Sequence, residues 1–202
     1  MILFNDSEIV VCIKERGVLS QQCKPGQKSM IDILSAECHS EIYPVHRLDK
    51  EVSGVMVYAK NAKAAANLSS QVSTREMEKH YIAITEKSTL KAEGVMEDLL
   101  FFDKSKNKSF VVKKERKGVK KAILEYKELS SDDDRTTFFV RLLTGRTHQI
   151  RVQFASRKLP LIGDRKYGSK IEGDIGLVSC FIGFKHPETG EWMEFKHPDY
   201  EI

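Results

Sequence analysis

The stretch that decides the fold is His46-Arg47-Leu48-Asp49-Lys50-Glu51-Val52-Ser53-Gly54, followed at once by the apolar run Val55-Met56-Val57-Tyr58-Ala59. The first part combines an acid, basic side chains and a Ser-Gly turn, and the second is typical of a buried strand. A loop that leads into a rigid strand can fix a carboxylate and still expose it to a substrate. Asp49 is therefore a candidate nucleophile or general base, although a lone aspartate before a turn more often serves only the turn.

A second polar cluster, Thr144-Gly145-Arg146-Thr147-His148-Gln149-Ile150-Arg151, lies about a hundred positions further on. Residues 147 to about 157 have helical spacing, so that His148 and Arg151 share one face. Ile150 and Phe154 give the same helix a buried side, which places Arg151 at the edge of the core. A bidentate ion pair with Arg151 would keep Asp49 ionised and oriented. The alternative is an ordinary solvated face of charged residues.

Length and composition predict one globular domain, or one domain with a small appendage. The chain has 202 residues, of which 41% are hydrophobic and 31% charged, so a core can form. No run approaches the ~20 apolar residues that cross a bilayer, and the first residues do not resemble a signal peptide, so we expect a cytoplasmic protein with no membrane contact. The four scattered cysteines are typical of reduced thiols, and the six histidines form no His-x-x-x-His pair, so no metal is expected.

Positive charge is concentrated between Phe101 and Lys121, a segment that we call the basic region. It holds nine Lys or Arg and two acids, a net charge of +7, whereas the whole chain carries +4 and the remainder therefore −3. A charge run is often only a solvated face. Such a concentrated patch can also neutralise the phosphates of a nucleic acid. Composition alone does not decide between the two.

Residue patterns predict many strands and few helices. Helices are expected from Ser29 to about Cys38 and, capped by Asn61, from Ala62 to about Thr74. A turn is expected at Lys24-Pro25-Gly26. Strands are expected in two parts of 2–13, then at 54–60, 79–85, 110–112, 121–129, 136–143, 181–184 and 192–195. This order predicts an α+β fold in which a mainly antiparallel mixed sheet is flanked by helices.

Two further features carry possible chemistry. In the strand at 79–85, alternation places Lys79, Tyr81 and Ala83 on the less apolar face, which we expect to be the more open one. Tyr81 is then either an ordinary strand tyrosine or an aromatic platform for a base. The loop Gly163-Asp164-Arg165-Lys166-Tyr167-Gly168 is most simply a turn with basic side chains, which can also line the rim of a cleft.

In order and spacing, these stretches resemble the RluA-type pseudouridine synthases, which isomerise uridine in ribosomal and transfer RNA. Four segments carry the resemblance: 46–54 with the catalytic aspartate, 79–83 with the tyrosine, 144–152 continuing to 159–168 with the arginine, and the final hairpin at 184–191. Some positions depart from the family pattern: Val52, Gln153, Lys158 and Ser179. The resemblance implies that residues 1–202 form one catalytic domain, with no additional RNA-binding domain.

The resemblance also implies roles for individual residues. Asp49 would begin the cleavage of the C1′–N1 glycosidic bond, after which the uracil turns and rejoins through C5 without cofactor or metal. Arg151 would be its ion-pair partner, and Tyr81 would lie against the flipped uracil. Arg47 would fill the space that the extruded nucleotide leaves. The residues expected to contact RNA are Arg47, His46, Lys79, Arg146 and His148.

Two other classes of function remain open at this point. One is an RNA-binding or chaperone-like module that keeps the fold and has lost turnover. The other is a hydrolase that uses Asp49 as nucleophile on another glycoside, but such enzymes usually need a second carboxylate and the sequence offers no obvious one. Our main prediction is a monomeric pseudouridine synthase that acts on structured ribosomal or transfer RNA.

Overall fold

The computed structural model describes residues 1–22 and 26–200 and divides into two compact units. The first unit comprises Met1–Lys79 and Val178–Ile202, and the second comprises His80–Leu177. Lys24 and Pro25 of the expected turn lie outside the described residues. Within the described ranges no helix has the length and apolar character needed to cross a membrane.

The first unit is built on a sheet of order β1-β2-β4-β10, in which β3 also pairs with β4 and β11 with β10. All of these pairs are antiparallel except β10 with β4, which confirms the predicted mainly antiparallel mixed sheet. Its strands are β1 (Ile2–Asn5), β2 (Ile9–Lys14), β3 (Tyr43–Pro44), β4 (Ser53–Ala59), β10 (Leu177–Lys185) and β11 (Trp192–Lys196).

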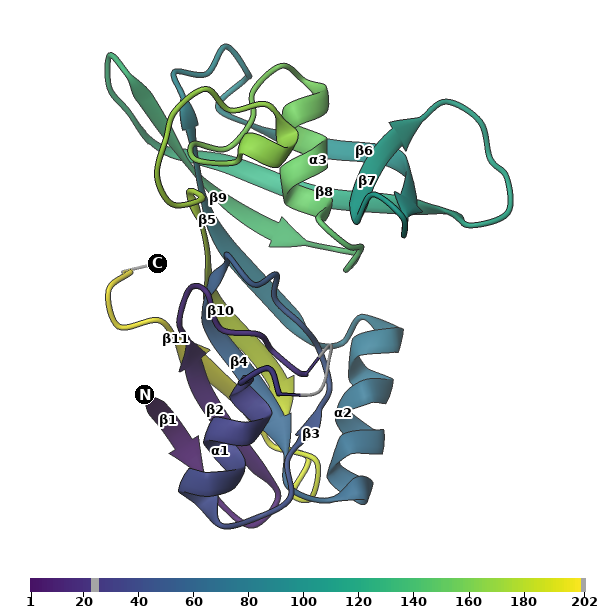
Figure 1. The fold of residues 1–202 in the computed structure, drawn as a ribbon, viewed down its shortest axis with the longest axis vertical. Helices are drawn as coiled ribbons and strands as arrows, with labels where there is room; N and C mark the ends of the chain where they lie inside the picture. Colours follow the sequence, from purple (N-terminus) through teal and green to yellow (C-terminus); the bar gives the residue numbers. More distant parts are fainter. Residues whose placement is uncertain (23–25, 201–202) are drawn as a thin grey trace. The chain divides into compact units, whose positions relative to one another are not determined.

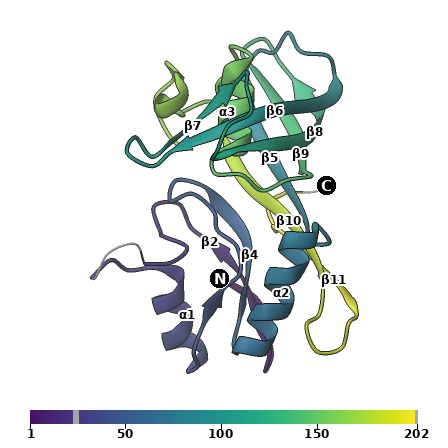
Figure 2. The same ribbon diagram turned by 90° about the vertical axis from the view of Figure 1, so that its right-hand side faces the viewer.

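Two helices of this unit lie on opposite sides of strands β2 and β4 (Figure 2). In α1 (Met30–Cys38) the Asp32 carboxylate accepts hydrogen bonds from the backbone N–H and hydroxyl of Ser29, each at 2.8 Å. In α2 (Ala62–Thr74) the Asn61 side chain accepts from the backbone N–H of Ala64 at 2.9 Å. Both predicted caps are therefore confirmed. One face of β2, β4 and β10 packs with Ala64 and Leu68 of α2 in a continuous apolar core.

Gly54 fixes the start of β4 against β10. It has a φ of +126°, and a Cβ atom there would lie 2.1 Å from the Ser179 carbonyl oxygen. Only glycine fits both the backbone angle and this close approach. Ser53 and Gly54, which end the Asp49 loop, are therefore held against β10, where they pair in parallel with Val178 and Ser179.

The second unit contains the antiparallel strand order β5-β9-β8-β6-β7 and one α-helix (Figure 1). Phe154 of the helix lies in tilted or edge contact with the rings of Phe138 and Tyr126 from β9 and β8. The elements are β5 (Glu78–Glu86), β6 (Glu93–Asp103), β7 (Lys108–Val112), β8 (Val119–Ser131), β9 (Arg135–Leu142), α3 (Gln149–Ser156) and a 3-10 helix, η1 (Arg165–Tyr167).

Two elements of this unit differ from the sequence-based expectation. Strand β6 was not predicted, because Gly94 and several acids interrupt its alternation; the Tyr126 hydroxyl lies over Gly94, 2.8 Å from where a Cβ would be. Helix α3 begins at Gln149 and not at Thr147, because His148 has a left-handed backbone with φ of +53°. His148 therefore precedes the helix and does not share its face with Arg151.

Candidate active site

The loop that carries Asp49 lies between β3 and β4 and has its backbone fixed on both sides of the aspartate. Leu48, directly before Asp49, donates its backbone N–H to the Ser20 hydroxyl at 3.1 Å. The same hydroxyl donates to the Leu48 carbonyl at 2.9 Å. The Asp49 carbonyl accepts the Val52 N–H at 3.0 Å, which closes the predicted turn. Asp49 is half-buried, so its carboxylate is held by a fixed backbone and is still partly exposed.

Lys14 holds the residue that follows Asp49. It is fully buried at the end of β2, and its ammonium donates to three backbone carbonyls at 2.8–3.1 Å, those of Glu15, Val18 and Lys50. The backbone N–H of Gly17 also reaches the Lys50 carbonyl, at 2.9 Å. Burial lowers the pKa of Lys14 to about 8, and the negative charges of Glu51 and Asp49 oppose that shift. Sequence reasoning missed this lysine, because nothing in its local pattern indicates burial.

His46 is a support for strand β4. Its Nε2 accepts the backbone N–H of Val57 at 3.2 Å, so the ring is neutral with its proton on Nδ1. Burial lowers the pKa of His46 to about 3, and the charge of Lys79 acts in the same direction. A neutral ring offers no charge to a phosphate, whereas Arg47, the next residue, is exposed. The predicted RNA contact of His46 stays a prediction.

The half-buried His46 predicts a loss of stability in mild acid. An unfolded histidine has a pKa near 6.5 and the folded one about 3, so the unfolded chain binds the extra proton between these values. The free energy of unfolding should therefore fall as the pH drops below 6.5, by on the order of 1 kcal/mol per pH unit. Urea unfolding between pH 7 and pH 5 measures this slope.

A matched pair of variants assigns the slope to His46. In His46→Gln the amide oxygen can still accept the Val57 N–H without titrating, so we expect a flatter dependence on pH. His39 is exposed, and His39→Gln should leave the wild-type slope unchanged. Equal slopes in wild type and His46→Gln would show that the imidazole is not the group responsible.

Arg151 forms a buried bidentate ion pair within the second unit. Its Nε and Nη2 donate to the Asp164 carboxylate at 2.7 and 2.8 Å. Arg151 is 5% exposed and Asp164 is 1% exposed, so water screens this pair very little. The guanidinium carbon also lies 5.2 Å from the centre of the Tyr167 ring. Contacts on the side and on the face of the guanidinium therefore fix its orientation.

Tyr167 connects Arg151 to His148. Its hydroxyl accepts the backbone N–H of Ser109 at 2.8 Å and lies 2.9 Å from His148 Nδ1. Burial raises the pKa of the Tyr167 hydroxyl to about 12. His148 is 8% exposed, so its ring is a buried support of this tyrosine. The other predicted RNA contact of this segment, Arg146, is half-buried and donates from Nε to the Lys121 carbonyl at 2.9 Å.

Sequence reasoning described the loop at 163–168 as a turn and missed Asp164 and Tyr167. The signal was Gly163, whose φ is +70° and whose Cβ would lie 2.1 Å from the Asp174 carbonyl oxygen. Glycine permits this positive φ, and the close approach of residue 174 leaves no room for a side chain. Here that conformation aims the Asp164 carboxylate at Arg151.

Tyr81 lies in β5 opposite Val140 of β9 and is only 6% exposed. The expectation that it occupies an open face is wrong. Alternation in a strand shows which face is more apolar, but here the neighbours Ile82 and Ala83 are buried as well, so both faces are covered. Its contact with a flipped base, like the ion pair between Asp49 and Arg151, stays a prediction.

Comparison with known proteins identifies the family of the chain. A family model described as RNA pseudouridylate synthase matches residues 8–156. The chain belongs to this family. The match includes the Asp49 loop, Tyr81 and Arg151. The resemblance read from the motifs is thereby confirmed.

Individual relatives agree with this assignment. An uncharacterized RNA pseudouridine synthase of Aquifex aeolicus (strain VF5) is 40% identical over 165 residues, which cover 75% of this chain and 51% of that protein. The ribosomal large subunit pseudouridine synthase D of Borreliella burgdorferi is 32% identical over 195 residues, 90% of this chain and 58% of that one. This pseudouridylate synthase family chain thus spans about half to three fifths of the length of these relatives.

A solved structure supports the fold. The structure titled human RNA pseudouridylate synthase domain containing 4 superposes with a TM-score of 0.80 at 23% identity, covering 97% of this chain and 87% of that one. At this level of identity the likeness concerns the fold alone. The predicted α+β pseudouridine synthase fold is confirmed.

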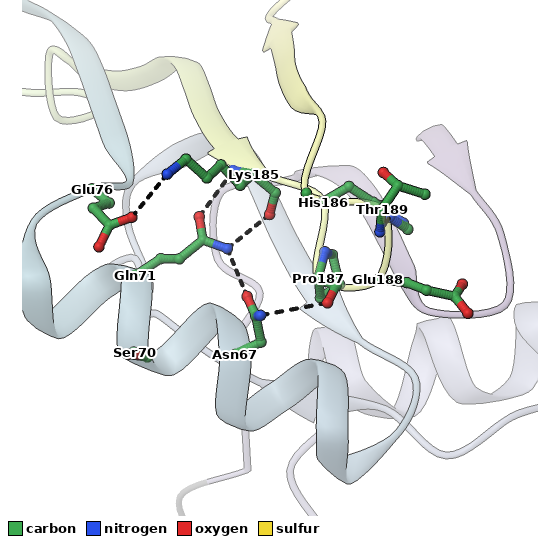
Figure 3. A pocket seen from close by; sticks show the side chains of 10 residues that line it. Asn67, Ser70, Gln71, Glu76, Lys185, His186, Pro187, Glu188 and Thr189 are labelled. Carbon is green, nitrogen blue, oxygen red and sulfur yellow. Dashed lines mark hydrogen bonds and ion pairs between the residues drawn. The ribbon is translucent and has the colours of Figure 1, made fainter.

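A surface pocket of about 360 Å³ lies between α2 and the turn after β10 in this synthase-family chain (Figure 3). The Gln71 amide crosses its floor and exchanges hydrogen bonds with the backbone N–H and carbonyl of Lys185, at 2.9 and 2.7 Å. Asn67 accepts a third bond from the same amide at 2.8 Å. These groups satisfy one another's hydrogen bonds, so the polar side chains here connect α2 to the β10–β11 hairpin. None of the predicted site residues lines the pocket.

Proposed function

We propose that this chain is an RNA pseudouridine synthase that isomerises uridine in structured ribosomal or transfer RNA. The observation that carries the proposal is the fixed backbone on both sides of Asp49, in a chain of the RNA pseudouridylate synthase family. A carboxylate that starts glycosidic cleavage must be held in one orientation toward its target. The loop contributes to this by fixing the backbone from which the Asp49 side chain extends.

The proposed reaction needs no co-reactant, because the product is an isomer of the substrate. Asp49 acts on the uridine, the C1′–N1 bond breaks, and the freed uracil turns until C5 takes the position that N1 held. A bond forms between C1′ and C5, the C5 proton leaves, and N1 gains a proton. Arg151 orients the Asp49 carboxylate in this proposal, Tyr81 contacts the flipped uracil, and Arg47 occupies the vacated position in the RNA.

The proposed setting is a monomeric catalytic domain, formed by residues 1–202, that works in the cytoplasm without cofactor or metal. The relative named for the ribosomal large subunit makes ribosomal RNA the first substrate to test. Transfer RNA is the second.

The basic region supports a role in holding the RNA backbone. It occupies the end of β6, β7, the start of β8 and the two loops that flank β7 (Figure 1). Eight of its nine cationic side chains are exposed, the exception being Lys108. Aromatic rings lie among them: Arg116 is 4.8 Å from the centre of the Phe101 ring, and Lys106 is 5.8 Å from that of Phe110. Cations interleaved with rings suit phosphates and unstacked bases.

Charge reversal in this region should flatten the salt dependence of RNA binding. In the variant Lys113→Glu, Lys114→Glu, Lys117→Glu, each phosphate contact that is lost should reduce the slope of log affinity against log salt by ~0.7–0.9. Filter binding at a series of salt concentrations measures the slope. The control reverses three exposed lysines elsewhere, Lys63, Lys91 and Lys170, and should keep a slope much closer to wild type. Equal slopes in the two triple variants would remove the basic region from the RNA interface.

One assay with the wild-type chain tests the proposed function. Bulk RNA from a strain that lacks the protein is incubated with it, and pseudouridines are then mapped. A newly formed site supports the synthase. RNA binding without any new site indicates a binding module, and free uracil with an abasic position indicates a hydrolase; either result overturns the proposal.

A further inference from the structure

We propose that Ser20 is a positioning residue for Asp49, acting through the backbone of Leu48. This inference rests on the proposed function, because it assigns a catalytic consequence to the geometry of the Asp49 loop. Ser20 lies outside the motifs that identify the family and 28 positions before Leu48. The proposed role needs no direct contact between the Ser20 hydroxyl and the Asp49 carboxylate.

The orientation of the peptide planes around Asp49 sets the direction in which its side chain leaves the loop. A peptide bond is planar, so a hydrogen bond to a carbonyl fixes the orientation of the whole unit up to the next Cα. The Leu48 carbonyl belongs to the unit that ends at Asp49 Cα, and the Ser20 hydroxyl donates to it at 2.9 Å. The next two carbonyls are held by backbone N–H groups, Asp49 by Val52 and Lys50 by Gly17. Three successive peptide planes are thus fixed, and Ser20 supplies the hydrogen bond that fixes the first.

Ser20 is suited to this role because it is itself immobile. It is 4% exposed, and the buried Tyr58 hydroxyl donates to its backbone carbonyl at 2.9 Å. Tyr58 lies in β4, within the core of the first unit. The Ser20 hydroxyl donates to the Leu48 carbonyl and accepts the Leu48 N–H, as a neighbouring strand would. This series of hydrogen bonds links a core strand to the loop through Tyr58, Ser20 and Leu48.

The consequence concerns the catalytic rate more than RNA binding. Without the hydroxyl, the peptide unit before Asp49 can rotate, and small displacements of a reacting group cost up to ~100-fold in rate. The Ser20 hydroxyl is buried and offers nothing to a phosphate. We therefore expect Ser20→Ala to lower kcat about 10- to 100-fold and to change the Kd for RNA by less than about twofold. Ser20→Thr keeps the hydroxyl and should recover most of the rate.

The experiment compares full-length variants by single-turnover kinetics, RNA binding and amide hydrogen exchange. Asn61→Ala is the control for general destabilisation, because it removes the cap of α2, at a cost of ~1 kcal/mol, without touching the loop. It should melt earlier than wild type and keep the wild-type kcat at 25 °C. In Ser20→Ala the amides of residues 48–50 should exchange faster, while those of β4 stay protected.

Three results would overturn the inference: a kcat for Ser20→Ala within twofold of wild type, a loss that appears in Kd instead, or an equal loss in Asn61→Ala. Failure of the proposed function gives a different pattern. If wild type forms no pseudouridine, the exchange measurement alone decides, and unchanged protection at residues 48–50 in Ser20→Ala rejects Ser20 as a support of the loop.

Discussion

Replacement of Asp49 by asparagine should lower pseudouridine formation by on the order of 10³-fold or more, while the protein stays folded. Asparagine has nearly the same size, but its amide is neither a nucleophile nor a base at neutral pH. The hydrogen bonds that hold the loop involve the backbone of residues 48–52, so the substitution leaves them intact. Single-turnover rates on RNA, with thermal unfolding of the same samples, measure both parts of this prediction.

The control for this variant is the neighbouring acid Glu51, which is exposed on the same loop. Glu51→Gln removes the same charge two residues away and should keep the rate within about threefold of wild type. Asp49→Glu restores the charge but moves it by one methylene, and should remain at least tenfold below wild type. If Asp49→Asn kept more than a tenth of the activity, or Glu51→Gln lost as much, Asp49 would not be the residue that reacts.

The sequence predicted the Asp49 loop well because its signals are local. A Ser-Gly turn followed by five apolar residues specifies a loop and a buried strand within a dozen positions, and Asn61 specifies its helix in the same way. The supports of the loop are not local. Ser20 and Lys14 reach Leu48 and Lys50 across 28 and 36 positions, through side chain to backbone contacts that no periodicity indicates.

Tyr81 and Asp164 are two further residues whose surroundings the local sequence did not reveal. Alternation ranked the faces of β5 but did not reveal that both are covered, so Tyr81 was placed on an open face and is in fact buried. Asp164 looked like a turn residue because it follows a glycine, yet the glycine serves to bring a buried carboxylate to Arg151. In both cases tertiary packing decides the environment of a side chain whose local structure was predicted correctly.

Replacement of Asp164 by alanine should lower the free energy of unfolding by ~3–5 kcal/mol. The change removes a carboxylate that accepts two hydrogen bonds from a guanidinium that is 5% exposed, so a buried charge loses this bidentate contact. The exposed pair of Arg165 with Glu172 is the matched control: its side chains are 75% and 85% exposed, and Glu172→Gln should change stability by less than about 1 kcal/mol. Denaturant unfolding of the three proteins measures the difference.

A double variant separates the structural from the catalytic role of the pair. Arg151→Met with Asp164→Leu replaces two buried charges by apolar side chains of comparable volume, which is often neutral for stability. We expect this variant to unfold much closer to wild type than Asp164→Ala does and still to form no measurable pseudouridine, because the cation proposed to orient Asp49 is gone. A double variant as stable and as active as wild type would show that the ion pair only fills space, and that Asp49 takes its orientation from its own loop.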